Sequence, residues 1–305
     1  MIRQVAIVLL VLVAGCGGQE RRATSVDGGA TLIREQRIAP RLLDLNLRSR
    51  ALGTTAKVLL MTPVGWSPGD SRRWPVLYLL HGCCDTYESW TRSTDVERMP
   101  QLRDVLVVMP EAGDVGFYSD WLDGPAWERF HLNELRRLLE REYGAGTRRA
   151  VAGLSMGGLG AMAYAARHPG FFAAAASFSG VLHPLADAAN LMGLFSNYAP
   201  DPRAIWGDPQ RRRDVWAHHD PTELADRLRG TRLFVSSGNG EPGPFEPPGA
   251  QPDPIEQSVM RQSRAFVDRL RRLKIPVEAD FYGAGVHSWP YWQRELERVL
   301  PLLAR

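Results

Sequence analysis

From about residue 41 onward, the chain alternates short apolar runs with longer amphipathic stretches. Short runs rich in aliphatic and β-branched residues predict strands at 41–47, 56–61, 75–80, 105–109, 149–152, 233–236 and 277–282. The first two of these runs are expected to form an opening pair. Continuous apolar runs of this length are typical of strands buried on both faces of a largely parallel sheet.

Helical periodicity separates these predicted strands. Residues 127–143 place apolar side chains at a period near 3.6, and residues 258–273 and 291–303 behave alike. Alternating strands and helices predict an α/β fold whose mostly parallel central sheet is flanked by helices on both faces. Residues 184–229 predict a helical excursion over the carboxyl edge of the sheet, and the Pro/Gly-rich residues 241–254 predict a loop.

The amino terminus has the pattern of an export signal. Arg3 precedes an apolar run at 5–13, which is shorter than the roughly 20 residues needed to span a bilayer. Small residues then lead to Cys16, which resembles the lipobox of bacterial lipoproteins. We therefore expect a signal peptide at 1–15 and a lipid on Cys16 as the only membrane anchor of an exported cell-envelope protein; the alternative is a plain secretory signal.

Composition adds mainly exclusions. Residues 16–36 are polar and Gly-rich, which predicts a flexible tether and leaves 37–305 as a single domain. With 44% hydrophobic and 23% charged residues among 305, the chain is expected to be globular. A net charge of +3, from 37 basic and 34 acidic residues, argues against a nucleic-acid partner, and three cysteines cannot form a disulfide framework.

Residues 153–158, Gly-Leu-Ser-Met-Gly-Gly, carry the first candidate chemistry. Gly-x-Ser-x-Gly places a serine on a sharp strand-to-helix turn, where glycines avoid collisions. The expected context is present, because a short apolar strand precedes the motif and a small-residue helix follows it. We therefore predict that Ser155 is a nucleophile.

A serine nucleophile needs a base that is oriented by an acid. In folds with this turn the chain order is Ser, acid, His, and His287 is the histidine that follows the last predicted strand. The acid is expected in the loop after 233–236, where Glu241, Glu246 and Asp253 are all candidates.

Two N–H groups should stabilise the oxyanion of the tetrahedral intermediate. The N–H of Met156 follows the nucleophile, and by position the second is assigned to Cys83, in His-Gly-Cys-Cys at 81–84. Cys83 and Cys84 have no second ligand pair with metal-site spacing, so no metal is expected. Of the remaining readings, two buried reduced thiols are preferred to a vicinal disulfide, which is strained and rare, and a Cys83 nucleophile would lack its own base.

Several segments together resemble the esterase D and mycolyltransferase family of α/β-hydrolases. They are residues 81–84, 116–121 (GFYSDW), 153–158, 238–240 (GNG) and 287–292 (HSWPYW), and they span the chain from about residue 40 to its end. The resemblance implies an α/β-hydrolase fold, a Ser–acid–His triad and no cofactor. It implies that the acid is a glutamate a few residues past 238–240, which points to Glu246 and secondarily to Glu241.

Departures from the mycolyltransferase pattern favour hydrolysis. Mycolyltransferases usually carry Asp-Gly-Leu where this chain has residues 81–83, and Ala or Ser where it has Gly157. We therefore predict a serine carboxylic-ester hydrolase with a small-molecule, lipid or carbohydrate ester as substrate. Acyl transfer to a carbohydrate acceptor in the cell envelope is the alternative, and intact Ser155 and His287 argue against a non-catalytic binding module.

Aromatic residues near these motifs are candidates for substrate binding. Trp289 stands two residues from His287, and Tyr118 and Trp121 lie in the segment 116–121. Packing in the core is the alternative role for each of them.

Overall fold

The computed structural model describes residues 29–303. The predicted signal peptide and Cys16 lie outside these residues. The expected tether at 16–36 is wrong at its carboxyl end, because strand β1 already begins at Thr31. No helix among residues 29–303 is long and apolar enough to cross a membrane.

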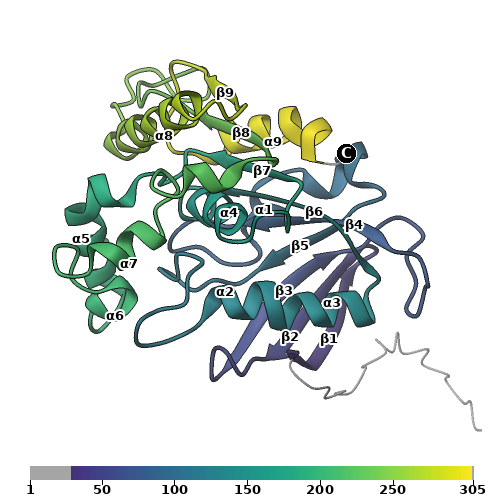
Figure 1. Cartoon of the computed structure of the whole chain (residues 1–305). Helices are drawn as coiled ribbons and strands as arrows, with labels where there is room; N and C mark the ends of the chain where they lie inside the picture. Colours follow the sequence, from purple (N-terminus) through teal and green to yellow (C-terminus); the bar gives the residue numbers. More distant parts are fainter. Residues whose placement is uncertain (1–28, 304–305) are drawn as a thin grey trace, which may run out of the picture.

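A single twisted sheet forms the centre of the molecule (Figure 1). Its order is β1-β2-β3-β5-β4-β6-β7-β8-β9. The strands β1 to β3 and their junction with β5 are antiparallel, whereas all pairs from β5 to β9 are parallel. The strands are β1 (Thr31–Ala39), β2 (Leu42–Arg48), β3 (Thr55–Met61), β4 (Trp74–Leu80), β5 (Leu106–Pro110), β6 (Ala145–Leu154), β7 (Ala174–Phe178), β8 (Arg232–Ser237) and β9 (Glu278–Phe281).

Helices cover both faces of this sheet. The α-helices are α1 (Ser89–Ser93), α2 (Trp127–Arg129), α3 (Arg136–Glu142), α4 (Met156–Arg167), α5 (Ala188–Tyr198), α6 (Arg203–Trp206), α7 (Arg213–His218), α8 (Pro254–Arg272) and α9 (Trp289–Leu303). Short 3₁₀ segments are η1 (Val96–Arg98), η2 (Pro100–Leu102), η4 (Pro184–Asp187) and η5 (Ala225–Leu228), and η3 (Phe130–Leu135) is a π-helical segment between α2 and α3.

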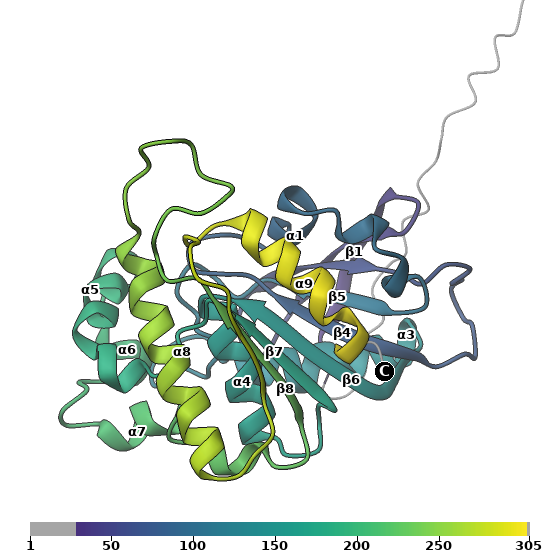
Figure 2. The same ribbon diagram turned by 90° about the horizontal axis from the view of Figure 1, so that it is seen from above.

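Two apolar clusters reflect the two covered faces. Buried residues of α3, α4 and α8 join one cluster, and buried residues of α1 and α9 join the other. Figure 2 shows α9 crossing one face of the strands, with α1 near its beginning. The predicted three-layer α/β arrangement is confirmed, and each predicted strand corresponds to a strand of the sheet.

Two strands of the sheet, β1 and β7, were not predicted from the sequence. The residues of β7 (Ala174–Phe178) are all buried between β6 and β8, but alanine has a low intrinsic preference for strands. Strand β1 lies at the edge of the sheet and is largely polar, so it lacks the apolar run that marked the others. Neighbouring strands, rather than local preference, decide both segments.

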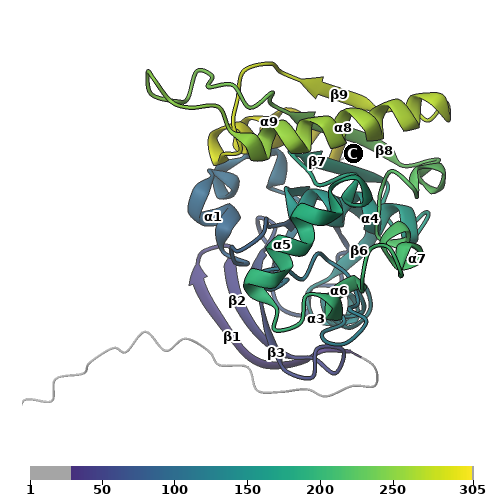
Figure 3. The same cartoon turned by 90° about the vertical axis from the view of Figure 1, so that its left-hand side faces the viewer.

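The helical excursion lies where the sequence predicted it. Residues 184–229 form η4, α5, α6, α7 and η5, and α5 faces the viewer in Figure 3. Leu191 and Leu194 of α5 line a cavity together with Ser155. The excursion therefore supplies one wall of the region where β6 ends.

Candidate active site

Ser155 occupies a strained turn between β6 and α4. Its backbone has φ 52° and ψ −118°, a left-handed conformation that side chains rarely adopt. Its N–H donates to the Phe178 carbonyl at 3.0 Å, which anchors the turn on β7. A Cβ at Gly153 would lie 2.2 Å from the carbonyl oxygen of Gly157, so the first glycine of the motif is required sterically. The predicted nucleophile turn is therefore present.

Gly82 lets the loop after β4 approach this turn closely. A Cβ placed there would lie 2.6 Å from Leu154 Cδ1 and 3.4 Å from Ser155 Cβ. Cys83, the next residue, lines a cavity with Ser155 and Met156. Met156 is the first residue of α4, and an N–H in the first turn has no acceptor within its own helix. Both expected oxyanion donors thus belong to residues beside Ser155.

His81 holds the peptide that carries one of these donors. Its Nε2 accepts from the Ala112 N–H at 3.0 Å, so its Nδ1 carries the proton and donates to the Gly82 carbonyl at 2.8 Å. The C=O and N–H of a trans peptide point in opposite directions. The bond from His81 to Gly82 therefore turns the N–H of Cys83 away from His81.

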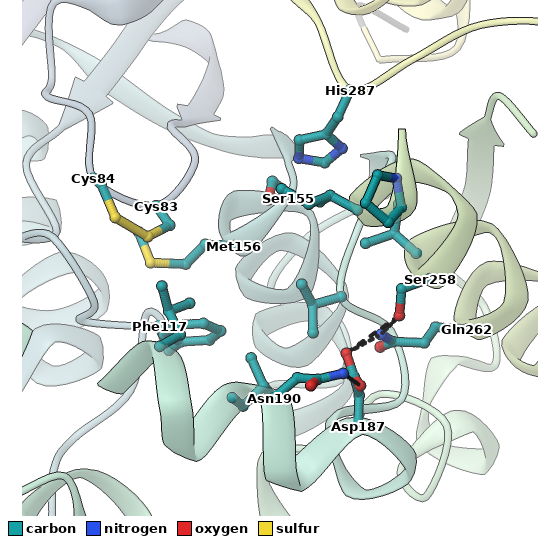
Figure 4. Close-up of a pocket in the computed structure, with 16 residues that line it drawn as sticks. Cys83, Cys84, Phe117, Ser155, Met156, Asp187, Asn190, Ser258, Gln262 and His287 are labelled. Atoms are coloured by element: carbon teal, nitrogen blue, oxygen red, sulfur yellow. Dashed lines mark hydrogen bonds between the residues drawn. A yellow bond between two sulfur atoms is a disulfide. The ribbon is translucent and has the colours of Figure 1, made fainter. Parts of the chain in front are cut away.

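Cys83 and Cys84 form a disulfide, so the expectation of two buried reduced thiols is wrong. Cys84 is exposed and Cys83 is half-buried, and both line the cavity beside Ser155 (Figure 4). The Cys84 N–H also donates to the Asp114 carbonyl at 3.0 Å. The disulfide restricts the Cys83–Cys84 dipeptide itself, and the hydrogen bond to Asp114 attaches the loop to the segment after β5.

His287 lies in the loop between β9 and α9, above Ser155 in Figure 4. Its Nδ1 is 2.8 Å from Oε2 of Glu256, in the first turn of α8. The other oxygen of Glu256 accepts from Ser179 Oγ at 2.9 Å, from Ser237 Oγ at 2.7 Å and from the Gly238 N–H at 2.7 Å. Glu256 is 0% exposed. This buried and fully hydrogen-bonded carboxylate orients the imidazole.

The prediction that Glu246 pairs with His287 is therefore corrected. Glu246 Oε2 accepts from the Tyr291 hydroxyl at 2.6 Å and from the Gly243 N–H at 2.7 Å. Glu241 is exposed, and the contact made by Asp253 is with the backbone N–H of His287 at 2.8 Å. None of the three candidate acids contacts the imidazole, because residues 238–253 loop outward before the chain returns at α8.

A helix-start signal could have located the acid. Asp253 caps α8, accepting from the N–H groups of Ile255 at 2.8 Å and Glu256 at 3.3 Å, and Pro254 occupies the first position. An Asp-Pro-x-Glu sequence is a typical helix start with an acidic third residue. The predicted helix began four residues later, at 258, which left Glu256 outside both the helix and the acid loop.

The three aromatic candidates have different positions. Trp289 lines a cavity of about 300 Å³ with Ser155 and His287. Tyr118 is wrong as a binding residue, because it is 0% exposed and its hydroxyl donates to the His81 carbonyl at 3.0 Å. Trp121 does not line either cavity at Ser155, and its indole N–H donates to the Gly116 carbonyl at 3.3 Å.

Two cavities meet at the nucleophile. The larger, about 550 Å³, is bounded by the loop after β4, by α5 and by the first half of α8. The smaller is bounded by Gly82, Cys83, Asp85, Leu154 and the segment that begins at His287. Ser155 and His287 line both of them. Within residues 29–303 no group of three or more His, Cys, Asp or Glu side chains could hold a metal ion.

The segment η3 contains a buried histidine, His131. His131 Nε2 is 2.9 Å from the Glu111 carbonyl, and its Nδ1 is 2.8 Å from the Tyr164 hydroxyl. The carbonyl requires a proton on Nε2, so Nδ1 accepts from Tyr164. Burial lowers the pKa of His131 from 6.5 to about 4.

This shift predicts acid sensitivity. The pKa of His131 is depressed in the folded protein, so its contribution to stability is complete above pH 6.5 and is lost as pH falls toward about 4. Between pH 7 and pH 5 it should cost about 2 kcal/mol of the free energy of unfolding. Urea titrations of the wild type and His131→Gln would measure this: the variant should lose less stability over that interval. Equal losses would contradict the assignment.

These features define the class of protein. A nucleophile turn at the end of a central parallel strand, a histidine after the last strand and a buried acid are the arrangement of an α/β-hydrolase with a serine nucleophile.

Comparison with known proteins gives the family. The family model described as "Putative esterase" matches residues 49–303, and the chain belongs to this family. The diacylglycerol acyltransferase/mycolyltransferase Ag85B of Mycolicibacterium smegmatis is 32% identical over 75% of this chain and 76% of its own length. Esterase Rv1288 of Mycobacterium tuberculosis is 30% identical over 73% of this chain and 53% of its own.

A solved structure agrees with this placement. Mycobacterium tuberculosis MPT51 (FbpC1) matches with a TM-score of 0.71 and 27% identity, over 87% of this chain and 98% of its own. The predicted α/β-hydrolase fold and the predicted family are confirmed. The protein is an enzyme with ester hydrolase or acyl transfer activity, as the sequence predicted.

Proposed function

We propose that the protein hydrolyses carboxylic esters through Ser155, His287 and Glu256. One observation carries this proposal: Ser155 and His287 both line the same two cavities, and Glu256 is hydrogen-bonded to Nδ1 of the imidazole. His287 would remove the proton of Ser155 through Nε2 as the hydroxyl attacks the ester carbonyl. Glu256 would hold the proton on Nδ1 and stabilise the imidazolium that forms.

The developing oxyanion would be bound by the N–H groups of Cys83 and Met156. A donor that is fixed before the reaction costs no reorganisation as charge develops. His81 and the disulfide both restrain the loop that carries Cys83. The alcohol would then leave with the proton from His287, and water, activated by the same base, would release the acyl group.

Acyl transfer to a carbohydrate acceptor is the second candidate. Similarity to a protein named as an acyltransferase favours it, whereas residues 81–83 and Gly157 depart from the mycolyltransferase pattern. Ser155 and His287 are both partly exposed, so water can reach the acyl group. The sequence departures and the access of water are the two reasons why we favour hydrolysis.

Labelling and product analysis test this function. A fluorophosphonate should modify Ser155, with the adduct located by peptide mass spectrometry, and an unlabelled ester should compete with it. The pure protein should then release free acid from an acyl ester at the same rate with and without trehalose. If acyl-trehalose forms faster than free acid, acyl transfer is the better description of the activity. Absence of the Ser155 adduct would contradict both hydrolysis and transfer through Ser155.

We also propose that the protein is exported as a lipoprotein of the cell envelope. The support is the apolar run at 5–13 followed by small residues and Cys16. Radiolabelled palmitate should enter the protein in a bacterial host and should be absent from Cys16→Ser. Equal label in the two proteins would contradict the anchor.

A further inference from the structure

The larger cavity beside Ser155 changes character along its length. Its walls include apolar side chains of α5 and α8, among them Leu191, Leu194 and Val259. Four polar residues then gather on the side away from His287, as Figure 4 shows: Asp187, Asn190, Ser258 and Gln262. An apolar cavity with a few placed polar groups is the usual form of a small-molecule site.

Asp187 is the acceptor at the centre of this polar end. Its Oδ1 accepts from Asn190 Nδ2 at 2.6 Å, and its Oδ2 accepts from Ser258 Oγ at 3.3 Å and Gln262 Nε2 at 3.2 Å. Gln262 is 5% exposed, and its Oε1 accepts from the His183 N–H at 3.1 Å. The carbonyl of Gln262 is thereby engaged with the backbone, which directs its amide N–H₂ toward Asp187.

The charge of Asp187 is not neutralised by these contacts. All three donors are neutral groups, and no ion pair within residues 29–303 includes Asp187. A carboxylate can accept about four hydrogen bonds, so one more donor can be accommodated. A ligand that presents a hydrogen-bond donor here would gain a charge-assisted bond. A ligand that ends in a carboxylate would be repelled.

The geometry of the two cavities decides which part of the substrate meets Asp187. The leaving alcohol must take its proton from His287. His287 lines both cavities, but only the smaller is also lined by the residues that follow it, Ser288, Trp289 and Trp292. We assign the smaller cavity, on this side of the base, to the alcohol. The larger cavity is then left for the acyl group.

We infer, building on the proposed function, that the enzyme selects acyl groups that are apolar along their length and carry a hydroxyl at the far end. Asp187 accepts the hydrogen bond of that hydroxyl, and Gln262 and Ser258 position Asp187. Helix α8 thus carries both the acid that orients His287 and the side chains that hold Asp187.

Matched esters test this selectivity. A series of straight-chain ω-hydroxyacyl esters of increasing length is compared with esters of the same length that end in a methyl or a carboxylate group. At one length the wild type should prefer the hydroxyl ester by about tenfold in kcat/KM, the gain expected for a hydrogen bond to a charged group. The carboxylate ester should be the poorest substrate at every length.

Two variants show whether Asp187 is responsible. Asp187→Asn keeps the shape of the side chain and its capping position before α5 but removes the charge. It should lose most of the preference for the hydroxyl ester over the methyl ester of the same length. Asp201→Asn removes a charge from the same excursion at a residue that does not line the cavity, and it should retain the preference.

The outcomes separate this inference from the proposed function. If Ser155 is labelled and esters are cleaved, but the wild type prefers no hydroxyl ester or Asp187→Asn keeps the preference unchanged, the role of Asp187 is overturned and the esterase stands. If no ester is cleaved and Ser155 is not labelled, the proposed function itself fails.

Discussion

Ser155→Ala is expected to lower kcat for ester cleavage by about a million-fold, the size of loss seen when a triad hydrolase loses its nucleophile. Without the hydroxyl no acyl-enzyme forms, and the oxyanion donors and substrate binding alone sustain a small residual rate. The change should leave the fold intact, because the Ser155 N–H still donates to the Phe178 carbonyl. Steady-state kinetics with an activated ester would measure the loss, and thermal unfolding would confirm that the variant is folded.

Ser196→Ala is the control for this experiment. Ser196 lies exposed on α5, and its hydroxyl donates to the Met192 carbonyl of its own helix at 2.8 Å. We expect wild-type kinetics from this variant. Ester cleavage by a folded Ser155→Ala at the wild-type rate would show that the nucleophile is elsewhere.

Glu256→Gln is expected to lower kcat by about ten-thousandfold, with a much smaller effect on KM. A glutamine can turn its amide N–H₂ toward Nδ1 of His287, which would favour the tautomer that cannot accept the proton of Ser155. Positive charge on the imidazole would also lose its buried counter-ion, which lies 2.8 Å away. Steady-state kinetics over a range of pH would separate kcat from KM.

Glu246→Gln provides a matched control for the acid. Its partners are Tyr291 and Gly243, so we expect kcat within a few-fold of the wild type. Glu256 is buried among Ser179, Ser237 and Gly238, so unfolding curves for Glu256→Gln are needed beside the kinetics. A large loss in Glu246→Gln, together with a near-normal rate in Glu256→Gln, would return the role to Glu246.

Local sequence was sufficient to predict Ser155, because the nucleophile turn is a local structure. The apolar end of β6, the glycines of the turn and the small residues of α4 are contiguous in the chain. His287 was predictable from chain order, because parallel strands end at one edge of the sheet and the loop after the last strand must lie there. The buried strands β4, β5 and β8 were likewise marked by their continuous apolar runs.

The partner of His287 could not be predicted from position in the chain. Residues 238–253 form an irregular loop, and no local pattern shows which of its three acids approaches His287. The resemblance to the family then favoured Glu246. The structure selects Glu256 because α8 begins at Pro254 and its first turn lies against the ends of β7 and β8. Burial and four hydrogen-bond donors then distinguish this carboxylate from the solvated ones.

The sequence by itself predicted the α/β architecture, the turn that carries Ser155 and the loop that carries His287, since each depends on local patterns or on the order of elements. Only the tertiary structure decided which carboxylate contacts His287, the buried position of Tyr118 and the polar end of the larger cavity. Each of these depends on which loops and helices meet in space. Such contacts join residues far apart in the chain, as Asp187 and Gln262 are. A local pattern such as the helix start at Asp253 can therefore suggest where a residue lies but not which residue it contacts.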